Sequence, residues 1–348
     1  MSNVKIEGRQ IGPGHPPYVI AELSANHNGN LDQALRIIDA AQKAGADAVK
    51  IQTYRPDTIT LNSDAPDFQI IDGLWAGRTL YDLYEWAHTP WEWHEALFAH
   101  AKARGITIFS SPFDPTAVDL LEELGAPAYK IASFEAVDLP LIRYVASKGK
   151  PMIISTGMAD LEEITEAVEA ARTGGCAELA LLHCVSGYPA PASDYNLNTL
   201  ADMAARFDVP VGLSDHTIDN TTAIASVALG AAIIEKHMTL DRTGGGPDDS
   251  FSLEPDEFAA LCKGARTAWE AMGGVDYGRK SSEVANVQFR RSLYFVKDMK
   301  AGDVIADDCV RSVRPGYGLA PKFLNDILGK HVKHDINRNS PVQFTDLG

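Results

Sequence analysis

Short hydrophobic runs recur through the first two thirds of the chain, and more polar stretches of helical length separate them. Eight of these runs have the length of a β-strand and are hydrophobic almost throughout. That pattern is typical of parallel strands that are buried on both faces. The eight predicted strands cover residues 18–24, 48–53, 106–111, 128–133, 151–157, 179–186, 210–215 and 233–238.

Helix start and stop signals lie between these runs. Asn30 is placed to cap a helix that ends near Gly45, and Asp160 with Glu163 begins another that ends near Gly174. The eightfold alternation of strand and helix predicts an α/β fold, a (β/α)8 TIM barrel. A doubly wound open sheet is the alternative. The barrel is favoured over it because the chain has no glycine-rich dinucleotide fingerprint.

One connection breaks this rhythm. More than thirty residues with no clear helix separate Thr53 from Pro90. A long connection in a compact domain is usually functional, so we expect this one to form a wall or lid of the site. The alternative is an insertion that packs down the side of the barrel. The aromatic residues of the connection include Trp75, Tyr81, Tyr84 and Trp86.

The hydrophobic pattern changes after residue 277. Short β-like pieces at 292–296 and 310–313 alternate with glycine-containing turns. We therefore predict a catalytic barrel over residues 1–277, a polar linker over 278–285 and a small β-rich domain over 286–348.

Charge and composition narrow the class of function. The net charge of -16 disfavours nucleic acid and anionic membranes as partners. Hydrophobic residues make up 45% of the chain, yet no run reaches the length of a membrane span, and the first residues lack a signal-peptide core. We expect a cytoplasmic protein whose four cysteines are free thiols.

Two histidines end neighbouring predicted strands, His216 in GLSDH and His237 in IIEKH. The carboxyl ends of parallel strands meet at one face, where α/β folds place their chemistry. Two imidazoles brought together there are candidate metal ligands. The alternative is a pair of unrelated polar residues that cap strand ends.

Other strand ends carry lysines and hydroxyls, which together suit a phosphate and a carboxylate. Any one of these residues alone is more typical of a polar strand end without a role. The prediction of an anion site therefore depends on several of them meeting at one face of the barrel. Lys236 has the opposite strand parity to His237, and we expect it to face the outer helices and pair locally. The candidates for anion binding are Lys50, Ser111, Lys130, Ser133, Ser155, Ser186 and Ser214.

Several motifs resemble those of the sialic acid synthase family. They are IAELSANHNGN, ADAVKIQTY, FSSPFD, YKIASFE, ISTGM, VGLSDHT and IEKHMTL. The tail, with RRSLYFVKDMKAGDVI and SVRPGYGL, resembles the antifreeze-like (SAF) C-terminal domain of that family. GGPDDSFSLEP and the region 75–93 most resemble the family's pseudaminic acid synthases.

The resemblance implies that phosphoenolpyruvate condenses with an N-acetylated amino sugar, giving a nine-carbon 2-keto acid and phosphate. It implies that His216 and His237 hold Mn²⁺ or Mg²⁺, with Co²⁺ or Zn²⁺ as other metals that fit. Lys130 matches the position that binds the carboxylate of phosphoenolpyruvate. By the same resemblance, Lys50 and the five serines match the positions that bind its phosphate.

The resemblance also places residues near the amino sugar and the reacting carbons: Glu22, Gln52, Tyr188 and Asp248. Phe113, just beyond the third predicted strand, is a further candidate for substrate binding. Either Glu22 or Asp248 is expected to deprotonate the attacking water. Arg314 matches an arginine that reaches the sugar bound in a partner subunit, which implies a domain-swapped homodimer.

Three other readings stay open at this point. One is an N-acetylneuraminate or legionaminate synthase. The second is a different metal-dependent barrel enzyme, which should lack the C-terminal domain. The third is a non-catalytic sugar-binding barrel, which should have lost some of these polar residues.

Overall fold

The computed structural model describes residues 3–348, which divide into two compact units, 1–273 and 274–348. Each unit has its own hydrophobic core. Within the described residues, no helix combines the length and the hydrophobicity needed to cross a membrane.

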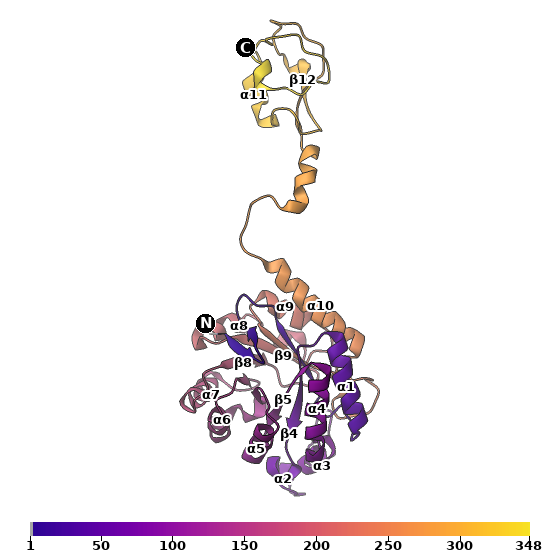
Figure 1. The fold of residues 1–348 in the computed structure, drawn as a ribbon, viewed down its shortest axis with the longest axis vertical. Coiled ribbons are helices and arrows are strands. Elements are labelled where there is room, and N and C mark those ends of the chain that lie inside the picture. Colours follow the sequence, from indigo (N-terminus) through magenta and orange to yellow (C-terminus); the bar gives the residue numbers. More distant parts are fainter. Residues whose placement is uncertain (1–2) are drawn as a thin grey trace. The chain divides into compact units, whose positions relative to one another are not determined.

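The first unit is built around a closed barrel of parallel strands, in the order β10-β3-β4-β5-β6-β7-β8-β9. This confirms the predicted barrel and excludes the open sheet. Helices surround the strands (Figure 1). The barrel strands are β3 Tyr18–Glu22, β4 Ala48–Thr53, β5 Thr107–Pro112, β6 Tyr129–Ile131, β7 Met152–Ser155, β8 Leu179–Cys184, β9 Val211–Asp215 and β10 Ile233–His237.

The barrel helices begin and end where capping chemistry places them. Asn30 accepts a hydrogen bond from the Gln33 backbone N–H, and Gly45 ends the same helix in a left-handed conformation. Asp160 and Glu163 form the predicted capping box. The helices are α1 Leu31–Ala44, α2 Pro56–Ile59, α3 Leu80–Ala87, α4 His94–Arg104, α5 Pro115–Glu123, α6 Leu139–Ala146, α7 Leu161–Thr173, α8 Thr199–Phe207, α9 Thr221–Ala228 and α10 Pro255–Met272.

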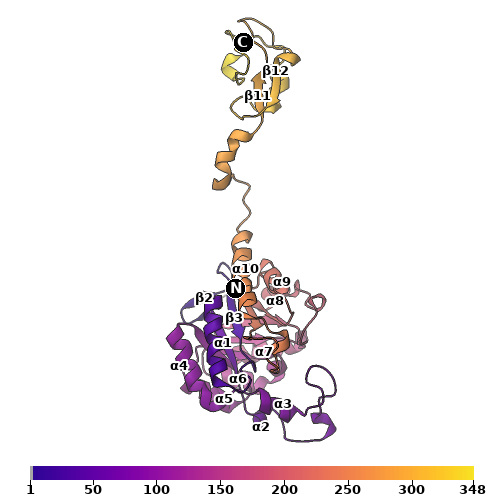
Figure 2. The same ribbon diagram turned by 90° about the vertical axis from the view of Figure 1, so that its right-hand side faces the viewer.

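A short hairpin, β1 Val4–Ile6 and β2 Arg9–Ile11, closes one end of the barrel core. Its residues Val4, Ile6 and Ile11 are buried in one cluster with inward-facing residues of the barrel strands. The connection that carries α2 and α3 lies at the other end of the unit (Figure 2). The hairpin and this connection therefore lie at opposite ends of the barrel unit.

The second unit pairs β11 Ser292–Phe295 with β12 Val310–Val313 in an antiparallel hairpin. A short helix, α11 Leu324–Ile327, packs into the same small core. Residues 281–289, which include part of the predicted linker, form a 3-10 helix.

Candidate active site

The two histidines meet at the carboxyl ends of β9 and β10, together with the loops that follow the strands; we call this end of the barrel the mouth. Their ring centroids lie 5.4 Å apart. His216 Nδ1 lies 2.8 Å from the carbonyl oxygen of Val185. A carbonyl only accepts, so Nδ1 carries a proton. Burial opposes the charged ring, but Cys184 and the Val185 carbonyl outweigh burial and raise the pKa of His216. Burial lowers the pKa of His237 well below its usual range, so the ring of His237 is neutral. Neutral imidazole is the form that binds metals.

The surroundings of these rings fit a metal ion with few protein ligands. His237 Nδ1 is buried without a hydrogen-bond partner in the described chain, and Asp248 Oδ2 lies 3.9 Å from it. Across residues 3–348, no group of three or more His, Cys, Asp or Glu side chains is placed to hold a metal. Two imidazoles would therefore leave several coordination positions to water and substrate oxygen.

A buried ion pair lies behind the histidines. Lys236 Nζ is 2.7 Å from Asp215 Oδ2 and donates to the carbonyl oxygen of Thr217 at 2.6 Å. This confirms that Lys236 points away from the mouth and pairs locally. Because Asp215 and Lys236 directly precede His216 and His237, this ion pair links the two strands that carry the histidines.

Lysines and carboxylates alternate in the top layer of the barrel interior. Lys50 Nζ lies 2.7 Å from Glu22 Oε2 and 3.2 Å from Ser111 Oγ. Lys130 Nζ lies 3.3 Å from Glu235 Oε1, to which Ser214 also donates. Burial disfavours the charged Lys50, but Glu22 and Glu235 outweigh burial and raise its pKa. At Lys130 burial prevails and lowers the pKa.

Glu235 is a member of this layer that the sequence reasoning missed. Burial alone would raise its pKa, but Lys130 and Lys50 outweigh burial and lower it. It stands two residues before His237, so strand alternation was the signal that placed it on the inner face.

Two serine hydroxyls, those of Ser133 and Ser186, lie near Gly157, and a third serine, Ser155, ends β7 two residues before that glycine. The hydroxyls of Ser155 and Ser186 are buried and have no hydrogen-bond partner in the part of the chain described. A Cβ added to Gly157 would lie 2.3 Å from Ser133 Cβ and 2.8 Å from Ser186 Oγ. The absent side chain of Gly157 thus leaves a cradle beside the serine side chains that an alanine methyl would fill, with unpartnered hydroxyls as donors for an anion.

Two carboxyl groups near the mouth are linked by polar side chains. Gln52 Nε2 donates to Glu22 Oε1 at 2.9 Å and to Ser24 Oγ at 3.0 Å, and Ser24 Oγ donates to Asp248. Burial raises the pKa of Asp248 to about 6 and also raises the pKa of Glu22. A carboxyl group with a pKa of about 6, as at Asp248, can exchange protons near neutral pH.

A cavity of about 350 Å³ opens above these groups. It is lined by Gln52, Phe113, Ser133, Tyr188, His237 and Asp248, and from the long connection by Trp75 and Tyr84 among others. The expectation that the connection forms a wall of the site is confirmed.

Two details of that expectation were wrong. The connection contains a regular helix, α3, which starts at a capping box of Thr79 and Asp82. Tyr81 and Trp86 do not line the cavity. The guanidinium of Arg78 lies over the ring of Trp86, with 4.4 Å between Arg78 Cζ and the ring centroid.

Glu135 is a second titratable residue that sequence reasoning missed. It lines the cavity two residues after Ser133, and its Oε2 is buried without a hydrogen-bond partner in residues 3–348. Burial raises the pKa of Glu135 to about 7. The signal was its position just beyond a strand end.

Arg314, by contrast, belongs to the second unit, where it directly follows β12 and is exposed.

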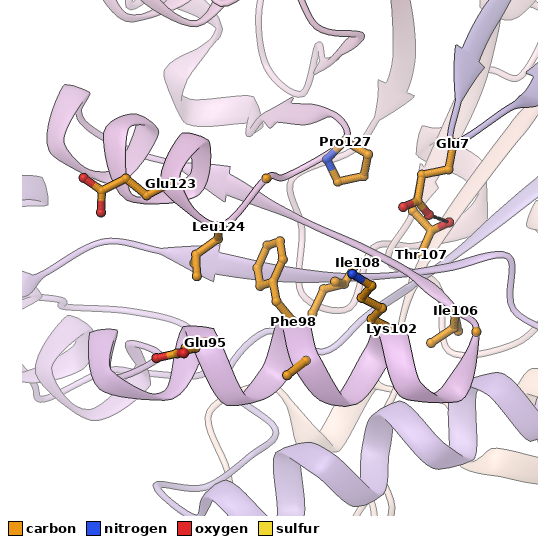
Figure 3. A pocket seen from close by; sticks show the side chains of 13 residues that line it. Glu7, Glu95, Phe98, Lys102, Ile106, Thr107, Ile108, Glu123, Leu124 and Pro127 are labelled. Atoms are coloured by element: carbon orange, nitrogen blue, oxygen red, sulfur yellow. Dashed lines mark hydrogen bonds between the residues drawn. The ribbon is translucent and has the colours of Figure 1, made fainter.

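A larger cavity, about 670 Å³, lies between α4 and α5 (Figure 3). Its lining includes the start of β5, Pro127 just before β6 and the hairpin residue Glu7, which accepts a hydrogen bond from Thr107 at 2.6 Å. These are the amino ends of the strands, away from the paired histidines and lysines, so we place the active site at the mouth instead.

Comparisons with known proteins agree with this arrangement. Residues 37–277 match the NeuB family, and residues 290–348 match the SAF domain. The pseudaminic acid synthase of Campylobacter jejuni subsp. jejuni serotype O:2 is 47% identical over 95% of this chain and 96% of its own. That of Helicobacter pylori is 40% identical over 95% and 98%. The crystal structure of N-acetylneuraminic acid synthetase from Leptospira borgpetersenii is 31% identical, with a TM-score of 0.73 over 83% of this chain and 96% of that one.

Proposed function

The chain belongs to the NeuB family, and we propose that it is a pseudaminic acid synthase. The reaction condenses phosphoenolpyruvate with 2,4-diacetamido-2,4,6-trideoxy-L-altrose and releases pseudaminic acid and phosphate. The observation that carries this proposal is the convergence in one mouth of two lysines, unpartnered serine hydroxyls, two imidazoles and two carboxyl groups of raised pKa. The two pseudaminic acid synthases named above support the choice of sugar.

Phosphoenolpyruvate is expected to bind along the lysine and serine layer. The cradle at Gly157 and the unpartnered hydroxyls of Ser155 and Ser186 suit phosphate oxygens, with Ser111, Ser133, Ser214 and Lys50 beside them. Lys130 would then meet the carboxylate. Both lysines pair with buried carboxylates, Lys50 with Glu22 and Glu235 and Lys130 with Glu235, and at Lys50 these partners favour the charged form.

Metal dependence is general in this family. We assign His216 and His237 as the protein ligands of Mn²⁺ or Mg²⁺, with Co²⁺ as a further ion that fits. When bound, such an ion would polarise the aldehyde carbonyl of the open-chain sugar.

The carboxyl groups would move the protons. C3 of phosphoenolpyruvate forms a bond to the aldehyde carbon, and the aldehyde oxygen takes a proton. Water then adds to the cationic C2 and gives up a proton, and loss of phosphate leaves the C2 ketone. The chain Glu22, Gln52, Ser24 and Asp248 links one carboxyl group to the other, so the pair can supply one acid and one base.

Phe113 and Tyr188 line the cavity where the sugar would lie.

We further propose a domain-swapped homodimer, in which Arg314 of one subunit reaches the sugar bound in the partner's barrel. The mouth exposes apolar side chains on loops that follow four barrel strands, which is typical of an interaction surface. They are Leu61, Ile71, Leu74, Phe134, Val137, Met158, Leu161 and Ile218.

Charge supports the same assembly. In residues 1–273 acidic side chains outnumber basic ones about two to one, whereas basic ones predominate in residues 274–348. Opposite net charges favour docking of the small domain on a barrel. We place the reaction in the cytoplasm, where phosphoenolpyruvate is made.

Mixing the enzyme with phosphoenolpyruvate, Mn²⁺ and the amino sugar tests the proposal. Phosphate release that needs both substrates is expected, with a nine-carbon keto acid as the other product. A non-catalytic sugar-binding barrel would bind the sugar without releasing phosphate, and that result would overturn the proposed reaction.

A further inference from the structure

We propose that Trp75 selects the amino sugar by contact with the apolar groups of the sugar. We also propose that a hydrogen bond from the Trp75 indole couples this selection to the loop that carries Asp248. The inference rests on the proposed function, because it names the group that distinguishes sugars in the same site. It goes beyond that function by assigning discrimination to one side chain among the aromatic residues of the long connection.

Trp75 lies at the tip of a hairpin formed by residues 69–79. Gln69 and Thr79 form an antiparallel bridge, the Ile70 N–H donates to the Arg78 carbonyl oxygen, and the Gly77 N–H donates to that of Ile70, both at 2.9 Å. Gly73 and Gly77 have φ of +87° and +88°. The backbone hydrogen bonds thus fix the hairpin, and the two glycines allow its tight turns.

The tip of this hairpin is otherwise open to solvent. Ile71 is 78% exposed, and a Cβ added to Gly73 or Gly77 would meet no atom within 4 Å. Trp75, in contrast, is half-buried and lines the cavity. Part of this connection projects from the barrel unit (Figure 2). The indole is therefore the side chain that brings the tip into the site.

The indole has two defined partners. Its Nε1–H donates to the Pro247 carbonyl oxygen at 3.0 Å, and its ring lies 5.7 Å from that of Tyr188. Tyr188 in turn lies 4.5 Å from His216 and 5.3 Å from Phe251, measured between ring centroids. Trp75 is thus the outer end of an aromatic row that begins at a candidate metal ligand.

The hydrogen bond joins two loops across the mouth. Pro247 directly precedes Asp248, whose carboxylate accepts a hydrogen bond from Ser24. A displacement of the Trp75 tip therefore acts on the backbone beside a candidate acid–base group. A sugar that packs well against the indole would hold this loop in place, whereas one that packs poorly would not.

The chemistry of the wall fits a 6-deoxy, diacetamido sugar. Such a sugar presents a methyl group and a second acetyl group where N-acetylmannosamine has hydroxyls. An indole face offers large apolar contact area to both. An apolar contact of this size discriminates between sugars by about 10-fold to 100-fold.

The test compares Trp75→Ala, Trp75→Phe and Trp86→Phe. Trp86 is a tryptophan of the same connection that packs on Arg78 and does not line the cavity, so it is the matched control. The readout is the ratio of kcat/KM for the 6-deoxy diacetamido sugar to that for N-acetylmannosamine. Calorimetric titration with each sugar, without phosphoenolpyruvate, gives a binding ratio that needs no turnover. Thermal unfolding checks that each variant folds.

Trp75→Ala should lower both ratios about 10-fold or more, with little change in the KM for phosphoenolpyruvate. Trp75→Phe keeps an aromatic ring but loses the N–H, so it should retain most of the ratio while kcat falls. Trp86→Phe should match the wild type. Unchanged ratios in Trp75→Ala, or an equal loss in Trp86→Phe, would overturn the inference. A wild type that binds the deoxy sugar selectively but releases no phosphate would contradict the proposed function, while the binding ratios would still decide the role of Trp75.

Discussion

The ring centroids of His216 and His237 lie 5.4 Å apart, and the two rings are inclined at 67°. The histidines stand at the carboxyl ends of β9 and β10, which are adjacent strands of the barrel. The buried pair of Lys236 and Asp215 joins these strands one residue earlier. The spacing of the imidazoles is therefore set by the barrel itself and not by a loop.

Loss of either imidazole should abolish turnover. We expect His216→Ala and His237→Ala each to lower the rate of phosphate release at least about 100-fold, because a Lewis acid supplies several kcal/mol of transition-state stabilisation. Circular dichroism should show an intact barrel. His100→Ala, which removes a histidine paired with Asp39 on the outside of the barrel, is the control. Wild-type activity after exhaustive chelation would contradict the metal assignment.

Gly157→Ala should block the phosphate cradle. Its methyl group would lie 2.3 Å from Ser133 Cβ, and Gly157 has φ of +46°. We expect the KM for phosphoenolpyruvate to rise about 10-fold or more, because the hydroxyls must move apart. Gly149→Ala is matched to it, since Gly149 has φ of +68° but open space around its Cα. An equal rise in KM in both variants would mean that backbone strain, not the cradle, is responsible.

Arg314→Ala should impair the use of the sugar far more than that of phosphoenolpyruvate. We expect a rise of about 10-fold in the KM for the sugar, the size of a lost charge-assisted hydrogen bond. Arg311, exposed on β12 three residues earlier, provides the control Arg311→Ala. Light scattering should give the mass of a dimer. A fully active monomer would exclude the swapped arrangement.

The pH dependence of the free energy of unfolding should reveal the buried carboxyl group of Glu135. Its pKa rises from 4.5 to about 7 in the folded state. The folded state therefore binds more protons between these values, so this residue lowers the free energy of unfolding as the pH rises from 4.5 to 7. Glu135→Gln should gain about 1–3 kcal/mol relative to wild type between pH 5 and pH 8. Glu166→Gln, which removes an exposed carboxyl group on α7 away from the cavity, is the matched control. Chemical denaturation at the two pH values measures this, and a constant difference for Glu135→Gln would refute it.

The barrel was predictable because each strand is a continuous apolar run, and the eight predicted strands overlap the eight observed ones. The alternation of side chains along a strand also predicted that Lys50 faces the barrel interior and that Lys236 does not. The same alternation would have placed Glu235 on the inner face. The hairpin of β1 and β2 was missed because its strands have only three residues each, although Glu7 and Gly8 form a typical turn between them. Which aromatic residue of the long connection reaches the site could not be predicted. Trp75 and Trp86 differ through the path of the hairpin and the partner Arg78, and neither periodicity nor composition encodes that path.

The most direct test of the account is a side-by-side assay of three sugars with the wild-type enzyme, phosphoenolpyruvate and Mn²⁺. The sugars are 2,4-diacetamido-2,4,6-trideoxy-L-altrose and the manno-configured precursors of N-acetylneuraminic and legionaminic acids. We predict that kcat/KM for phosphate release is highest with the altrose derivative, by about 10-fold or more, and that the product has the mass of pseudaminic acid. A clear preference for either manno-configured sugar would contradict the account.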